Sequence, residues 1–159
     1  RTADDGLLAL QKNDYDVLEL TYNLLDQSPK DNGLIEFALN RKTFLVAKAP
    51  LCYGFLTGKY TTNSQFGQDD HMHRWPRKQR DRWITDTESF EFLCDNSMKT
   101  ISQAALQFCM VRENSILPIP GMKTVKQVEK NISAAFAPPL TKHELHKIQE
   151  VYSSISSRL

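Results

Sequence analysis

Two glycine-containing segments of this chain carry residue types that a phosphate-bearing ligand requires. The first runs from Pro50 to Tyr60 and reads PLCYGFLTGKY. Gly54 and Gly58 permit tight turns and a close approach of a ligand to the backbone, and Lys59 supplies a point charge suited to a phosphate. The same residues also fit an ordinary glycine turn followed by a solvated lysine, and the pattern alone does not choose between the two.

The second segment runs from Ile119 to Asn131 and reads IPGMKTVKQVEKN. A strand that ends before Gly121 and a helix that begins at Thr124 would turn free backbone N–H groups and the positive end of a helix toward the connection. This arrangement binds anions, and Lys123 adds a positive charge beside it. The segment therefore predicts an anion site.

Two carboxamides follow in the same helix. Gln127 and Asn131 are four residues apart and share one helix face, so near a phosphate site they could hydrogen-bond a nucleobase. A capping box formed by Thr124 and Gln127, with Asn131 in solvent, explains the same residues. Both interpretations stay open at this level.

Each of the two segments follows a short apolar run. Three such runs cover residues 17–20, 44–49 and 116–119, and they are mostly continuous rather than alternating. Continuous runs are typical of parallel sheets that are covered on both faces. The two segments then lie at the C-terminal ends of parallel strands, where α/β folds place their ligands.

Amphipathic helices are expected between and after the strands, which gives an α/β protein with a parallel sheet. Residues 61–86 are polar and without periodicity, which predicts a long surface loop. An apolar stripe at helical spacing follows Thr124 and consists of Val125, Val128, Ile132 and Ala135. The expected helix starts are Asp31 ahead of Leu34, Thr85 with Glu88 ahead of Phe90, Ser102, Thr124 with Gln127, and Thr141 with Glu144.

Three strands are too few for a closed (β/α) barrel, which needs eight. They would leave two open sheet edges and an uncovered interior. The pattern of elements therefore fits either a small open sheet or part of a larger barrel, and the periodicity does not decide between them.

The bulk composition narrows the classes of function. The formal net charge is +1 over 159 residues, so nothing global indicates nucleic acid or a membrane as a partner. No apolar run approaches the roughly 18–20 residues of a membrane helix, and no signal-peptide pattern opens the chain. The three cysteines, Cys52, Cys94 and Cys109, form no CxxC pair, which indicates a reduced, cytoplasmic protein.

Taken together, the two segments resemble the aldo-keto reductase family, in particular the branch that includes bacterial aldo/keto reductases and the potassium-channel β-subunits. That branch carries a (S/A)PL…G.LTGKY signature after one strand and PG.(K/R)…Q(V/L)…N at the last barrel strand and helix. Residues 22–25, YNLL, match as well. The resemblance runs in order from about Tyr15 to Tyr152. It implies that residues 1–159 form the C-terminal portion of one (β/α)8 TIM barrel, with parallel strands, surrounding helices and the N-terminal half absent.

The resemblance further implies an NADP(H)-dependent oxidoreductase that reduces a small-molecule carbonyl substrate, with NADP as the cofactor. Ala49, Pro50, Leu51, Cys52 and Gly54 would line the pyrophosphate and nicotinamide ribose, and Lys59 would meet the phosphates. The adenosine end would be held by Gly121, Met122 and Lys123, with Lys123 on the 2′-phosphate and Gln127 and Asn131 on the adenine.

Three positions depart from the family pattern. The loop arginine of relatives follows an Asp-His pair, whereas here Met72 follows Asp70-His71, so Arg74 becomes the candidate. Lys48 stands where many members stack an aromatic residue on the nicotinamide. Glu19 stands where relatives often carry a glutamine, and a carboxylate cannot donate to the carboxamide oxygen.

The resemblance places the catalytic tyrosine, lysine, aspartate and histidine in the first half of the barrel. No catalytic residue is therefore assigned here, and we expect this chain alone to be a poor catalyst. A non-catalytic NADP-binding or partner-docking module, and a half-barrel that pairs as a homo-oligomer, are the alternatives. The run from His71 to Trp83 is basic with interleaved tryptophans and could bind single-stranded nucleic acid. The preferred interpretation is a solvated loop that covers the cofactor.

Overall fold

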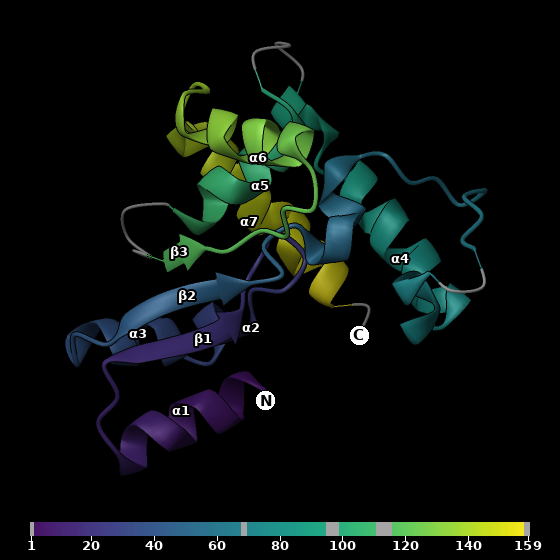
Figure 1. Cartoon of the computed structure of the whole chain (residues 1–159). Coiled ribbons are helices and arrows are strands. Elements are labelled where there is room, and N and C mark those ends of the chain that lie inside the picture. The colour runs from purple at the N-terminus through teal and green to yellow at the C-terminus, as the bar shows by residue number, and fades with distance from the viewer. Residues whose placement is uncertain (1, 68–69, 95–98, 111–115, 158–159) are drawn as a thin grey trace.

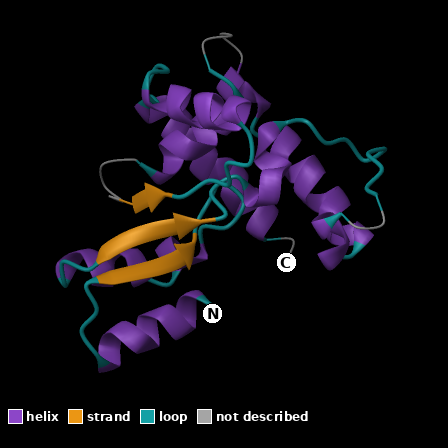
Figure 2. Cartoon of the chain, in the orientation of Figure 1, coloured by secondary structure: helices purple, strands orange, loops and turns teal. Residues whose placement is uncertain are grey.

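A parallel sheet with helices packed on it is the centre of the chain. The computed structural model describes residues 2–67, 70–94, 99–110 and 116–157 (Figure 1). Within that part, one sheet holds the strands β1 (Val17–Thr21), β2 (Phe44–Lys48) and β3 (Ile116–Pro118), in that order and all parallel (Figure 2). The expected strands and their parallel pairing are confirmed.

Helices connect and cover these strands. The α-helices that the structure describes are α1 (Ala3–Lys12), α2 (Ser28–Asp31), α3 (Leu34–Asn40), α4 (Arg77–Glu88), α5 (Ile101–Cys109), α6 (Val125–Ile132) and α7 (Lys142–Ser156). Short 3-10 turns lie at η1 (Cys52–Thr57), η2 (His71–Arg74), η3 (Glu91–Cys94) and η4 (Ser133–Ala135). None of the helices in the described ranges has the length and apolar character of a membrane span.

The two faces of the sheet differ sharply. Successive side chains of a strand point to opposite faces, and on one face Leu20, Leu45 and Ile116 are buried. On the other face Val17 and Phe44, which are register partners, are half-exposed. Within the described residues, helices therefore cover only one side of the sheet.

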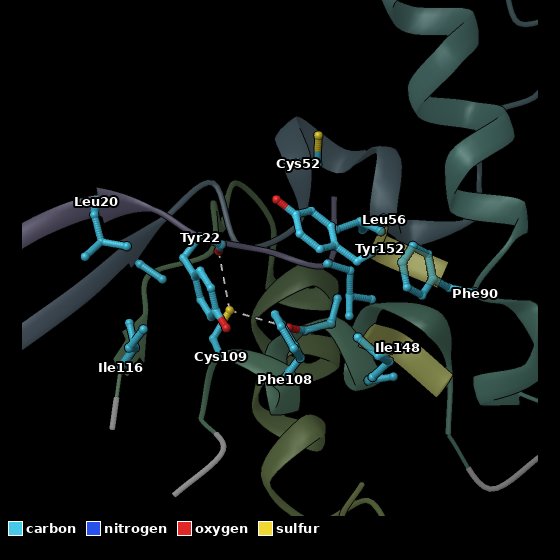
Figure 3. Close-up of a cluster of buried hydrophobic side chains, with 14 of the residues drawn as sticks. Leu20, Tyr22, Cys52, Leu56, Phe90, Phe108, Cys109, Ile116, Ile148 and Tyr152 are labelled. Atoms are coloured by element: carbon cyan, nitrogen blue, oxygen red, sulfur yellow. Dashed lines mark hydrogen bonds between the residues drawn. The ribbon is translucent and has the colours of Figure 1, made fainter. Parts of the chain in front are cut away.

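The core lies between the sheet and α5 and α7 (Figure 3). The ring of Tyr22 stacks on that of Phe108 with centroids 5.2 Å apart. The Cys109 thiol donates to the Tyr22 carbonyl oxygen over 3.5 Å, and burial raises the pKa of that thiol to about 12. These contacts fix the end of β1 against α5.

Two of the expected helix starts are confirmed and three are wrong. Thr124 and Thr141 each form a complete capping box. Thr100, not Ser102, caps α5, since its hydroxyl accepts from the Gln103 N–H. Asp31 ends α2, and Gly33 in the left-handed region precedes α3.

The expected loop over residues 61–86 is wrong in its second half, because α4 begins at Arg77 and runs through Thr85 to Glu88. Pro76 lies at its N-cap, and an Arg82–Asp86 pair four residues apart supports it. The helix buries chiefly Ile84 and two polar residues, so apolar periodicity could not reveal it. Thr85 and Glu88 therefore lie in the last turn of a helix and cap nothing.

Candidate functional site

The loop after β2 has an unusual backbone. Ala49, Cys52 and Tyr53 all take positive φ angles, of 50°, 44° and 57°, followed by Gly54 at 101°. A non-glycine residue in this region is costly, by about 1–2 kcal/mol, and such strain is concentrated at functional sites. The loop therefore holds a backbone conformation that an unfolded chain would rarely adopt.

Backbone hydrogen bonds close this loop on itself. The Cys52 N–H donates to the Ala49 carbonyl oxygen over 2.8 Å, and the Gly54 N–H donates to the Leu51 carbonyl oxygen over 2.9 Å. Within the loop, Pro50 and Cys52 are buried. The predicted pyrophosphate loop is thus a single preformed turn.

Asn23 anchors the loop from the neighbouring strand. Its Nδ2 donates to the Ala49 carbonyl oxygen over 3.0 Å, while its Oδ1 accepts from the Leu25 and Asp26 N–H groups. The side chain is buried. The YNLL motif is part of the family resemblance, but no local pattern assigns this asparagine a role, because its partner lies 26 residues away in the chain.

Cys52 is not a reactive thiol in this setting. Burial, and then the Asp26 carboxylate, raise the pKa of the Cys52 thiol far above its usual range. A protonated, buried thiol is a poor nucleophile. The position of Cys52 beside the cofactor phosphates stays a prediction.

Two of the three departures from the family pattern, Lys48 and Glu19, lie together on the exposed face of the sheet. Lys48 Nζ is 3.7 Å from Glu19 Oε1, and both side chains are about half exposed. The ion pair joins the last residue of β2 to the middle residue of β1. A basic residue in place of an aromatic one is therefore matched by an acidic residue in place of a glutamine.

The remaining predicted charges differ in their surroundings. Lys59 lies at the far end of the loop, with Nζ 4.4 Å from the centroid of the Tyr60 ring. Arg74 is exposed at the end of η2. The adjacent Trp75 packs on Tyr53 with ring centroids 4.2 Å apart, which places η2 against the loop after β2.

The segment after β3 is exposed from Gly121 through Lys130. Gln127 Oε1 accepts from the Lys123 N–H over 2.6 Å and from the Thr124 N–H over 3.2 Å. The capping box that the sequence left as one of two options is therefore present. Met122, the other backbone contact expected here, is exposed as well.

Asn131 is the second carboxamide of this segment. Its Nδ2 is buried and has no hydrogen-bond partner within the described residues. A buried donor without a partner is rare in proteins and calls for an explanation. An acceptor atom on a ligand at this helix would supply one.

The two segments lie next to each other, because they leave neighbouring parallel strands at the same edge. Ala47 pairs with Pro118, and the Ile119 N–H donates to the Ala47 carbonyl oxygen over 3.0 Å. The structure thus brings the predicted phosphate loop and the predicted adenosine segment together, as the sequence required.

The tryptophans of the basic run are packed inward. Trp75 and Trp83 lie against the loop after β2, and the Trp83 ring is 5.2 Å from Phe55. Both rings are partly buried against these neighbours. Within the described residues no three His, Cys, Asp or Glu side chains form a group that could hold a metal ion.

Residues 7–153 match the family model described as the aldo/keto reductase family. The chain belongs to the aldo/keto reductase family. This aldo/keto reductase family member is 31% identical over 105 residues to the aldo-keto reductase yakc of Schizosaccharomyces pombe, which covers 64% of this chain and 31% of that protein. It is 25% identical over 143 residues to the Arabidopsis thaliana protein named "Probable voltage-gated potassium channel subunit beta", covering 86% of this chain and 44% of that protein.

Solved structures agree with the fold. The glycerol dehydrogenase AKR11B4 from Gluconobacter oxydans superposes with a TM-score of 0.72 at 20% identity, over 87% of this chain and 42% of that chain. The fold is part of a (β/α)8 barrel. The chain spans less than half the length of the relatives it matches, 31% of one and 44% of the other.

Proposed function

We propose that this chain provides the NADP(H)-binding part of an aldo-keto reductase that reduces carbonyl compounds by hydride transfer. The observation that carries the proposal is the pair of adjacent segments at the ends of β2 and β3, one a preformed backbone loop and the other a helix start. The yakc relative is named as an NADP(+) enzyme, which supports the choice of cofactor. The carbonyl substrate and any homo-oligomer are part of the same proposal.

The residues fit the cofactor. Ala49, Pro50, Leu51, Cys52 and Gly54 offer a cradle in which a Cβ on Gly54 would clash with nothing, since it would make ordinary van der Waals contact with Tyr60 at 3.7 Å. A ligand can therefore approach Gly54 closely. The unpartnered Nδ2 of Asn131 suits an acceptor on the adenine ring. When bound, the cofactor supplies the hydride.

The positive charges near the proposed site favour NADPH over NADH, because only NADPH carries a 2′-phosphate. Lys59 follows the loop after β2 and Lys123 follows β3, and both are exposed, as is the third cation, Arg74. A 2′-phosphate adds up to two negative charges beside the N-terminus of α6, which already favours anions. A hydrogen bond between charged groups is worth about 1.5–3 kcal/mol, which corresponds to roughly a ten- to hundredfold preference.

Substitution of Lys123 tests the proposal. Lys123→Ala should weaken NADPH binding about ten- to hundredfold and leave NADH binding nearly unchanged, because only NADPH carries the 2′-phosphate. Gln127→Ala and Asn131→Ala should weaken both cofactors alike, since both contain adenine. Binding is measured by tryptophan fluorescence, because Trp75 and Trp83 are the two tryptophans of the chain and Trp75 packs on the loop after β2.

The control is Lys142→Ala, which removes the same charge from an exposed position at the start of α7. It should change neither cofactor's affinity. Equal losses of NADPH and NADH on Lys123→Ala would show that this lysine does not recognise the 2′-phosphate. Absence of binding by either cofactor to the unmodified protein would overturn the proposed function.

A further inference from the structure

A cavity of about 530 Å³ lies beside the loop after β2, on the side of α4 and the end of α7. Its lining comes from four places in the chain: the turn after β1, the turn at Cys52, helix α4 and the last turns of α7. Figure 3 shows Cys52 and Tyr152, which line two of these sides. The expected cofactor contacts use the same loop but not this cavity, apart from Cys52.

Three aromatic rings form one wall of the cavity. Tyr53, Trp75 and Trp83 all line it. The centroid distances are 4.2 Å from Tyr53 to Trp75, 5.8 Å from Tyr53 to Trp83 and 5.5 Å from Trp75 to Trp83. The three rings contact one another, so they form one continuous aromatic surface at the border of the cavity.

A carboxylate lies in the same cavity. Asp26 Oδ1 accepts from the Ser28 hydroxyl over 2.6 Å and from the Ser28 N–H over 3.2 Å, and no basic side chain within the described residues forms an ion pair with it. Its field, after burial and the neighbouring Cys52, helps to raise the pKa of the Tyr53 hydroxyl above its usual range. Asp26 therefore brings a carboxylate to the lining of the cavity.

The positive charge in the lining is already matched. Arg82 Nε is 3.3 Å from Asp86 Oδ2, and Arg82 Nη2 donates to the Ile155 carbonyl oxygen over 3.0 Å. Asp86 is buried, so this pair contributes little net charge. Asp26 is thus the carboxylate of the lining that no described basic side chain pairs with.

An aromatic wall beside a carboxylate is the chemistry that recognises an organic cation. We propose that this cavity binds an ammonium or pyridinium group, and that the carbonyl substrate carries such a group. The second half of this statement rests on the proposed reductase function. The first half concerns the cavity alone and is tested without any cofactor.

The test compares matched probes on the unmodified 159-residue protein. Benzyltrimethylammonium is titrated by calorimetry and by tryptophan fluorescence, with benzyl alcohol as the neutral probe and benzoate as the anion. We expect the cation to bind about tenfold more tightly than the neutral probe and benzoate to bind least. Equal binding of the cation and the neutral probe, or no binding of the cation, would overturn the inference.

Two variants locate the site. Asp26→Asn keeps an acceptor for Ser28 and should remove most of the preference for the cation, while the affinity for benzyl alcohol stays the same. Trp75→Leu should weaken both probes. Asp14→Asn is the matched control, since Asp14 is an exposed carboxylate paired with Arg41, and it should change nothing. An Asp26→Asn protein that keeps the full preference would refute the assignment to this cavity.

The outcomes separate this inference from the proposed function. NADPH binding without cation binding would support the reductase and overturn the cavity's specificity. Cation binding without NADPH binding would support the cavity and overturn its link to a reductase substrate.

Discussion

In the loop after β2, Cys52, Phe55 and Leu56 are buried, whereas the whole of 121–130, after β3, is exposed. Both segments are proposed to hold the same cofactor. The first is shaped by the core of this chain. The second is shaped by a capping box and by its link to β3, so its geometry depends far less on burial. Preorganisation of a binding site can thus be uneven within one ligand's footprint.

The apolar stripe of α6 shows the same contrast. Val125, Val128 and Ile132 fall at helical spacing, as expected, yet they are 75%, 36% and 55% exposed. Within the described residues, the stripe that should hold α6 in place has no core beneath it.

Removal of a buried ring should give the largest difference between the two segments. Phe55→Ala should lower the free energy of unfolding by about 3–5 kcal/mol, because the ring packs between Tyr60 and Trp83 and leaves a cavity. Val125→Ala on α6 should change it by less than about 0.5 kcal/mol. Urea denaturation of both variants, monitored by circular dichroism, gives the comparison.

A loss on Val125→Ala that approaches the loss on Phe55→Ala would contradict the contrast. It would mean that the α6 stripe is buried in solution, by a second copy or by another part of the molecule. Repeating the measurement at two protein concentrations separates these cases, since only self-association depends on concentration.

Loss of the ion pair between Lys99 and Glu144 should have an intermediate effect on the free energy of unfolding. Lys99 Nζ lies 2.9 Å from Glu144 Oε1, with the side chains 7% and 18% exposed, and it joins the starts of α5 and α7. Burial opposes ionisation of Glu144, but the Thr141 N–H and Lys99 outweigh it and lower the pKa of Glu144. Glu144→Gln keeps the capping box and should cost about 1.5–3 kcal/mol at pH 7.

The sign of the pH dependence follows from the lowered pKa. The stabilisation by Glu144 is complete above the ordinary glutamate pKa of about 4.3 and is lost as the pH falls through the lower pKa of the folded state. The difference between the unmodified protein and Glu144→Gln should therefore shrink as the pH falls below the ordinary glutamate pKa. Glu150→Gln, on an exposed pair with His146, is the control and should have little effect at any pH. A difference that stays constant with pH would contradict this role of the charge.

Local rules predicted the parts of this fold that depend on local chemistry. Continuous apolar runs located the three strands, and the capping boxes at Thr124 and Thr141 are confirmed. Helix α4 was not predicted because the residues it buries are mainly polar. Periodicity also could not show that the apolar side of α6 is exposed. Periodicity reveals an apolar side but not whether anything covers it.

The candidate site divides in the same way. The resemblance supplied the two segments, and the parallel order of β2 and β3 explains why they meet. The cavity with Asp26 and Trp75 could not be predicted, because its walls come from segments far apart in the chain. One of these walls is α4, which lies in a segment whose polar sequence predicts a loop. The anchoring role of Asn23 also depends on a contact between two strands that no local pattern encodes.

Alanine substitutions at two glycines should give the smallest change in the free energy of unfolding. They also test the contrast between the two segments most directly. Gly58 ends the η1 turn with a φ of 69°, and a Cβ there would lie 3.2 Å from Ile101 Cγ2. Gly58→Ala should therefore cost about 1–2 kcal/mol. Gly121 has open space around it and no positive φ, so Gly121→Ala should be neutral or stabilise the fold by up to about 1 kcal/mol.

Thermal and urea unfolding of the two alanine variants measure these changes, and NADPH titration supplies a second readout. If the backbone of Gly121 contacts the cofactor, Gly121→Ala should weaken NADPH while the fold stays intact, because the new methyl group occupies space that is open in the protein alone. Loss of stability on Gly121→Ala would show that the segment after β3 is as constrained as the loop after β2. Unchanged stability together with unchanged NADPH affinity would remove Gly121 from the cofactor site and leave Lys123, Gln127 and Asn131 to define it.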